Sequence, residues 1–118
     1  MAGIDEREVL VKKEKNRLKK LFNNIPTSKL KVVDGLIIQA ARLRVLLNEM
    51  WIDISENGDY ELFSQSDKAE PYERERPVAR LYNTRDQSYH RIIRQLTDLL
   101  PDEKDKEEVK RYTASDLI

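Results

Sequence analysis

One long amphipathic segment, from Ser28 to Gly58, constrains the fold of this chain most, because it carries apolar side chains on two nearly opposite sides. At 100° per residue in an α-helix, the first stripe advances in alternating steps of three and four residues. It consists of Val33, Leu36, Ala40, Leu43, Leu47, Met50 and Ile54. The second stripe consists of Ile38, Ala41, Val45 and Ile52. One partner helix covers only one stripe, so we expect the second to form an interface between copies of the chain.

The composition favours extended, solvated helices over a large core. The chain has 118 residues, enough for one modest domain, and 37% of them are charged, against roughly 25% in average soluble domains. Cysteine is absent, which excludes disulfides and thiolate metal sites and is compatible with a reducing compartment. No apolar run reaches the roughly 18 residues of a membrane span. The sequence therefore predicts a protein of the cytoplasm.

Periodicity and turn residues predict an all-α fold that begins with a basic N-terminal helix. This helix is expected from about Asp5 to Asn24, before Pro26 interrupts the chain. Thr27 or Ser28 is expected to cap the long second helix. The Asn-Gly pair that ends at Gly58 supplies its stop.

A third helix is expected to return antiparallel along the second and so to form a long helical hairpin. Tyr60–Phe63 is a short extended candidate, and Ser64–Arg76 is expected to be a polar loop. The third helix begins near Pro77, since proline suits a first helical turn, and ends before Pro101. Its apolar face consists of Val78, Leu81, Tyr82, Tyr89, Ile92, Ile93, Leu96, Leu99 and Leu100. The expected parts are a basic helix over 1–26, an oligomerisation hairpin over 27–101 and a charged C-terminal tail over 102–118, with Leu117 and Ile118 as a candidate docking tip.

The sequence holds no set of residues typical of an enzyme, a cofactor site or a metal site. His90 is the single histidine, and a packed or half-exposed imidazole fits it better than a base or a ligand. The acidic run after Pro101 lacks the spacing and the glycine of a calcium loop, so a solvated tail fits it better than a cation site. No glycine-rich phosphate loop is present. We therefore expect no catalytic role, no cofactor and no metal.

The strongest chemical signal is a cationic array on the first helix. Its members are Lys12, Lys13, Lys15, Arg17, Lys19 and Lys20. Such an array neutralises successive phosphates and releases counterions, which gives DNA affinity without sequence preference. A merely solvated face is the competing interpretation, and the sequence leaves both open.

The third helix carries a second cationic array, which consists of Arg76, Arg80, Arg91 and Arg94. Arginine pairs in a planar fashion with carboxylate or phosphate, so the array suits either DNA or the acidic 49–75 region of a neighbouring copy. Arg85 falls inside the apolar arc and is expected to snorkel or to pair with Glu49 or Asp53. Trp51 is expected to pack in the core or an interface rather than against a base.

Charge is strongly segregated along the chain, although its formal net charge is zero. Residues 1–31 hold nine Lys/Arg against four Asp/Glu, a net charge of +5. Residues 32–75 hold four against ten, a net charge of −6. This pattern indicates an acidic partner for the basic parts, with the acidic middle turned away or paired with a neighbouring copy.

Two segments resemble the small terminase subunits of tailed phages and prophages of Gram-positive bacteria. They read LIIQAARLRVLLNEMWIDISENGDYELF and RPVARLYNTRDQSYHRIIRQLTDLLP. The likeness spans roughly Ile25 to Pro101. Its marks are a long helix that ends in Asn-Gly, a Tyr-Glu stretch, a Pro-Val-Ala helix start and a closing Leu-Leu-Pro.

This resemblance implies a non-catalytic DNA-packaging component in the cytoplasm of a bacterial host. Members of the family assemble as rings, recognise viral double-stranded DNA and deliver it to a large subunit with ATPase and nuclease activities. The family often carries a helix-turn-helix domain, for which this chain offers only one basic helix and a turn, so backbone contact by Lys12 to Lys20 is expected. Two alternatives remain: a phage head-assembly protein that does not bind DNA, and a small dimeric DNA-binding regulator.

Overall fold

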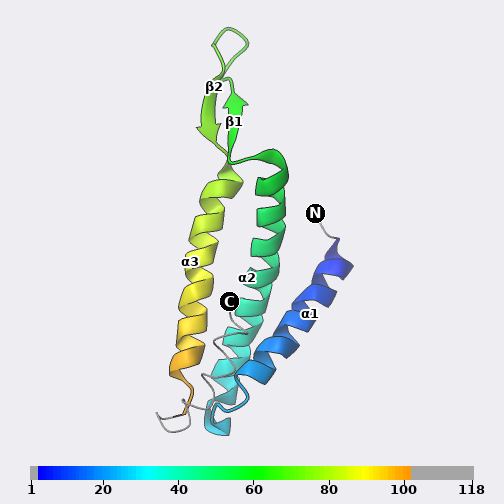
Figure 1. Cartoon of the computed structure of the whole chain (residues 1–118), viewed down its shortest axis with the longest axis vertical. Coiled ribbons are helices and arrows are strands. Elements are labelled where there is room, and N and C mark those ends of the chain that lie inside the picture. Colours follow the sequence, from blue (N-terminus) through cyan, green and yellow to red (C-terminus); the bar gives the residue numbers. More distant parts are fainter. Residues whose placement is uncertain (1–2, 102–118) are drawn as a thin grey trace.

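The computed structural model describes residues 3–101, which form three helices and a small two-stranded sheet (Figure 1). In chain order the elements are α1 (Ile4–Leu21), a 3-10 turn η1 (Thr27–Lys29), α2 (Leu30–Asn57), β1 (Tyr60–Phe63), β2 (Tyr72–Glu75) and α3 (Pro77–Asp98). The expected all-α class is confirmed at this level, with the sheet as a small addition. The expected tail over 102–118 lies outside the described residues.

The central helix is α2, and the other two helices lie on different sides of it (Figure 1). α3 runs antiparallel to α2 along most of its length, while α1 contacts the first part of α2 and tilts away from it toward the N-terminus (Figure 1). The β-hairpin projects beyond the shared end of α2 and α3. The result is an elongated body of 66 × 31 × 24 Å.

The ends of α2 are set by local backbone chemistry. The backbone N–H of Lys29 donates to the Pro26 carbonyl at 3.0 Å, so Thr27 and Ser28 are drawn into the 3-10 turn. Neither side chain caps α2, whose preceding residue is Lys29, and the predicted cap is therefore wrong. At the other end, Gly58 adopts φ 84° and donates its N–H to the Ile54 carbonyl at 2.7 Å. A positive φ favours glycine, as expected for this stop.

The core lies along α2, because that helix packs against α1 and α3 at once. Every residue of the first apolar stripe is buried or half-buried. The sequence reasoning left out Ile37, which is 2% exposed and belongs to the same core as Leu18 of α1 and Leu96 of α3. Ile37 lies between the two stripes, so a helix that packs partners on both sides buries it as well.

The second stripe of α2 is covered in part by the chain itself. Ala41 and Val45 are buried and Ile38 is half-buried, whereas Ile52 is 56% exposed. α1 lies along the first part of α2, so a second helix of the same chain meets this side. The interface role of Ile38, Ala41, Val45 and Ile52 stays a prediction, and Ile52 is the member that remains accessible.

The expected polar loop over Ser64–Arg76 contains a strand instead. Residues Tyr72–Glu75 pair antiparallel with Tyr60–Phe63, with Phe63 opposite Tyr72 and Glu61 opposite Arg74. Arg74 forms an ion pair with Glu61 at 2.7 Å, and its guanidinium lies 3.5 Å from the centre of the Phe63 ring. Cross-strand pairs of this kind stabilise a hairpin. They are invisible to a search for apolar alternation, which explains why this strand was missed.

Within residues 3–101, no helix combines the length and the apolar character that crossing a membrane requires.

Candidate nucleic-acid interface

α1 is anchored on one face and cationic on the other. Leu18 and Phe22 are 0% and 3% exposed and hold the helix against the core. Lys12, Lys13, Lys19 and Lys20 are exposed, and Lys15 is half-buried at the border. Among residues 3–101 none of these lysines lies within ion-pairing distance of a carboxylate. We call Lys12, Lys13, Lys19 and Lys20 the lysine face.

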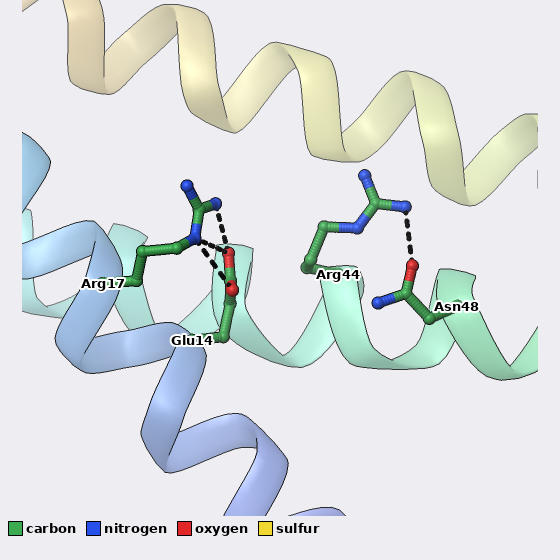
Figure 2. A network of polar contacts seen from close by, with 4 residues as sticks. All are labelled: Glu14, Arg17, Arg44 and Asn48. Atoms are coloured by element: carbon green, nitrogen blue, oxygen red, sulfur yellow. Dashed lines mark hydrogen bonds and ion pairs between the residues drawn. The ribbon is translucent and has the colours of Figure 1, made fainter. Parts of the chain in front are cut away.

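Arg17, which the sequence places in the same cationic array as these lysines, forms an ion pair within α1. Its Nε donates to both carboxylate oxygens of Glu14 at 3.0 Å, one turn earlier on α1. Figure 2 shows this pair on the side of α1 that faces Arg44 of α2. The spacing of three residues between a glutamate and an arginine is a helical ion-pair signal, so the sequence contained this information.

The N-terminal half of α1 is tied to α2 by a long-range ion pair. Arg7 donates to Glu49 from Nη2 at 2.6 Å and from Nε at 3.2 Å. The Glu49 side chain is only 10% exposed, which reduces solvent screening of the pair. This contact holds α1 in place where its apolar packing ends, so it fixes the direction in which the lysine face points.

Two lysines outside the sequence-predicted array extend the cationic surface. Lys29 of η1 and Lys31 of α2 are exposed and belong to the segment where α2 starts, at the end of the molecule where α1 stops (Figure 1). In the sequence they were counted only in the net charge of residues 1–31. Their position beside the turn between the first two helices could have indicated that they lie close to the end of the first helix.

The arginine array of α3 is split by the structure. Arg80, Arg91 and Arg94 are exposed, and within residues 3–101 they meet no carboxylate. Arg76, by contrast, precedes α3 and donates to both oxygens of Asp53 at 3.0 and 3.1 Å. The Asn57 amide and then the Arg76 guanidinium donate hydrogen bonds that lower the pKa of Asp53.

The observed contacts correct part of the expectations for Arg85 and Trp51. Arg85 is exposed, and the two acids proposed for it have other partners, since Glu49 binds Arg7 and Asp53 binds Arg76. Trp51 is 57% exposed and packs one face near Tyr82, with ring centres 5.8 Å apart. It is therefore not a core residue, and its packing in an interface between copies stays a prediction.

His90 is exposed, and its Nε2 lies 3.5 Å from an Asp86 oxygen one turn away. Within residues 3–101 no group of His, Cys, Asp and Glu is arranged to hold a metal ion.

A groove of about 780 Å³ opens where α1 tilts away from α2, and we call it the α1–α2 groove. Its lining residues are Leu10, Lys13, Glu14, Arg17, Arg44, Val45, Asn48, Glu49, Ile52, Asp53, Glu56 and Asn57. Arg44 donates to the Asn48 side chain at 3.1 Å (Figure 2), and its guanidinium lies 5.0 Å from the centre of the Tyr89 ring of α3. Burial raises the pKa of the Tyr89 phenol. Charged side chains that contact one another therefore line the sides of the groove, and Val45 lies at its floor.

Comparison of the chain with protein-family models, with characterised proteins and with solved structures gave no match.

Proposed function

We propose that this protein is a non-catalytic DNA-packaging component of the small terminase type, which self-associates and binds viral double-stranded DNA. In this role it acts in the cytoplasm of a bacterial host and delivers DNA to a large terminase subunit. It assembles as a ring, as the resemblance in sequence implies.

The observation that carries the proposal is the lysine face of α1. Four exposed lysines lie on a helix whose other face is fixed to the core through Leu18 and Phe22. A rigid helix already fixes the backbone that carries these lysines, so less backbone freedom is lost when they bind phosphates. Each contact is weak alone, and an oligomer that presents the face repeatedly adds avidity.

The structure supports contact with the DNA backbone rather than with base edges. Phosphate contacts position a protein on DNA without reading its sequence directly, and the lysine face contains four flexible point charges of the kind that make such contacts. We therefore propose binding with little sequence preference.

The test replaces Lys12, Lys13, Lys19 and Lys20 with Gln in one variant and measures binding to two unrelated duplexes over a range of salt concentrations. If all four contact phosphates, the magnitude of the slope of log affinity against log salt falls by about 3.6 per bound subunit, at ~0.9 per contact. Affinity for both duplexes falls alike. Light scattering without DNA measures the mass of the variant, so that a loss of DNA binding is distinguished from a change in assembly.

A matched control replaces the exposed arginines of α3, Arg80, Arg91 and Arg94, with Gln. It removes cations from another face and is expected to leave the salt slope unchanged. Equal affinity and slope for wild type and the lysine variant would exclude α1 as the DNA surface. A loss seen only in the arginine variant would move the site to α3, and no binding by the wild type would favour a head-assembly protein.

A further inference from the structure

The projecting β-hairpin carries an apolar face that its own chain leaves open. Tyr60 and Leu62 are 61% and 74% exposed. Their cross-strand partners are Glu75 and Glu73, which therefore share this face of the ribbon. A two-stranded hairpin is at best marginally stable alone in water, so a surface that packs against Tyr60 and Leu62 would stabilise it.

The α1–α2 groove presents the converse shape, a hollow lined in part by apolar side chains. Leu10 of α1 and Ile52 of α2 are 45% and 56% exposed, and Val45 is buried at the floor between the helices. The groove lies where α1 tilts away from α2 (Figure 1). The ion pair between Arg7 and Glu49 still links the N-terminal half of α1 to α2.

The charges of the two surfaces are complementary. Three carboxylates of the groove are already paired with arginines of the same chain, namely Glu14, Glu49 and Asp53. Lys13 and Arg44 also line the groove and have no carboxylate partner among residues 3–101. Glu56, at the far end, is the remaining acid. The groove thus offers Lys13 and Arg44 to the acids Glu73 and Glu75 of an incoming hairpin.

We propose that the hairpin of one copy inserts into the α1–α2 groove of the next copy. Leu62 and Tyr60 then pack on Leu10 and Ile52, with Glu73 near Lys13. The inference rests on the self-association in the proposed function and assigns its two surfaces. A projection and a groove are different patches, so the contact is head-to-tail, and such contacts close into rings or continue as filaments.

The test uses two single variants that each remove one surface. Leu62→Glu places a charge on the hairpin face, and Ile52→Glu places one in the groove. Both side chains are exposed in one chain, so helix content by circular dichroism is expected to stay unchanged. Each variant alone is expected to fall from the wild-type oligomer mass to that of a single chain, 13.9 kDa.

Mixing the two variants makes the test decisive. The Ile52→Glu chain keeps an intact hairpin and the Leu62→Glu chain keeps an intact groove, so a head-to-tail contact forms one junction between them. We expect a one-to-one complex of twice the single-chain mass. The control Val32→Glu, at a 61% exposed apolar residue elsewhere on α2, is expected to keep the wild-type mass.

Two outcomes would overturn this assignment while the wild type still oligomerises: either single variant keeps the wild-type mass, or the mixture remains monomeric. The second result would mean that the hairpin of one copy does not enter the groove of another. A wild-type chain that is monomeric at micromolar concentration would overturn self-association in the proposed function as well. The lysine-face test then still decides DNA binding, because it compares salt slopes and not masses.

Discussion

Arg76 joins the end of α2 to the start of α3 by donating to both carboxylate oxygens of Asp53, at 3.0 and 3.1 Å. The same guanidinium donates from Nη1 to the Gly58 carbonyl at 2.8 Å, and the Arg76 backbone N–H donates to the Asp59 carbonyl at 2.7 Å. One residue therefore closes the base of the hairpin and fixes the point from which it projects.

The first prediction is a pH-dependent contribution of Asp53. Hydrogen bonds from Asn57 and Arg76 lower its pKa below the ordinary 3.8. A carboxyl group whose pKa is lower in the folded state stabilises that state above the unfolded pKa, and this stabilisation is lost as the pH falls through the folded pKa. In urea unfolding, the free energy of unfolding of wild type is expected to exceed that of Asp53→Asn at pH 7. This difference is expected to shrink below about pH 4. An equal difference at pH 7 and pH 2 would contradict the prediction.

The second prediction concerns the packing of α3 against the core. Leu96 is 0% exposed, so Leu96→Ala removes methyl groups from a filled site and is expected to cost roughly 2 to 5 kcal/mol of unfolding free energy. Leu81 lies on the same helix and is 43% exposed. Leu81→Ala is the control and is expected to shift the urea midpoint much less. Equal shifts for both variants would show that α3 does not bury Leu96 as described.

The third prediction compares one substitution at Gly35, inside α2, and at Gly58, which directly follows α2. Gly58 has φ 84°, a conformation that strains any side chain, so Gly58→Ala is expected to lose roughly 1 to 3 kcal/mol. Gly35 lies inside the helix, with nothing within 4 Å of an added Cβ, so Gly35→Ala is expected to gain roughly 0.5 to 1 kcal/mol. Thermal unfolding of both variants shows whether each substitution lowers or raises the stability of the protein. A gain at Gly58 would rule out the conformation described for the end of α2.

The helices were predictable because local residue patterns indicate where each one starts, where it ends and which side is apolar. Pro77 marks the start of α3 and Gly58 the stop of α2, and both act through their own backbone chemistry. The first apolar stripe of α2 needs only the helical period to be seen. Ile37 escaped because its burial requires two partner helices at once, and the sequence pattern alone supplied one.

The candidate site was predictable only in part, for a related physical reason. The lysines of α1 lie opposite Leu18 on a helical wheel, and their exposure follows from that. The partners of Arg7 and Arg76 are 42 and 23 residues away in the chain. Such pairs depend on how helices pack, which a periodic pattern does not encode. The strand Tyr72–Glu75 depends in the same way on β1 across the hairpin.

The long axis of the molecule has a direction, because its two ends carry opposite charge. Lys19 and Lys20 belong to the last turn of α1, and Lys29 and Lys31 to the start of α2, at one end of the molecule (Figure 1). The hairpin at the other end carries Glu61, Glu73 and Glu75. In the proposed head-to-tail contact, the acids of each hairpin lie in the groove of the next copy, whereas the lysines at the other end of each copy stay exposed. If the proposed assembly binds DNA, we therefore expect a DNA end to be drawn to the side of the assembly that carries these lysines.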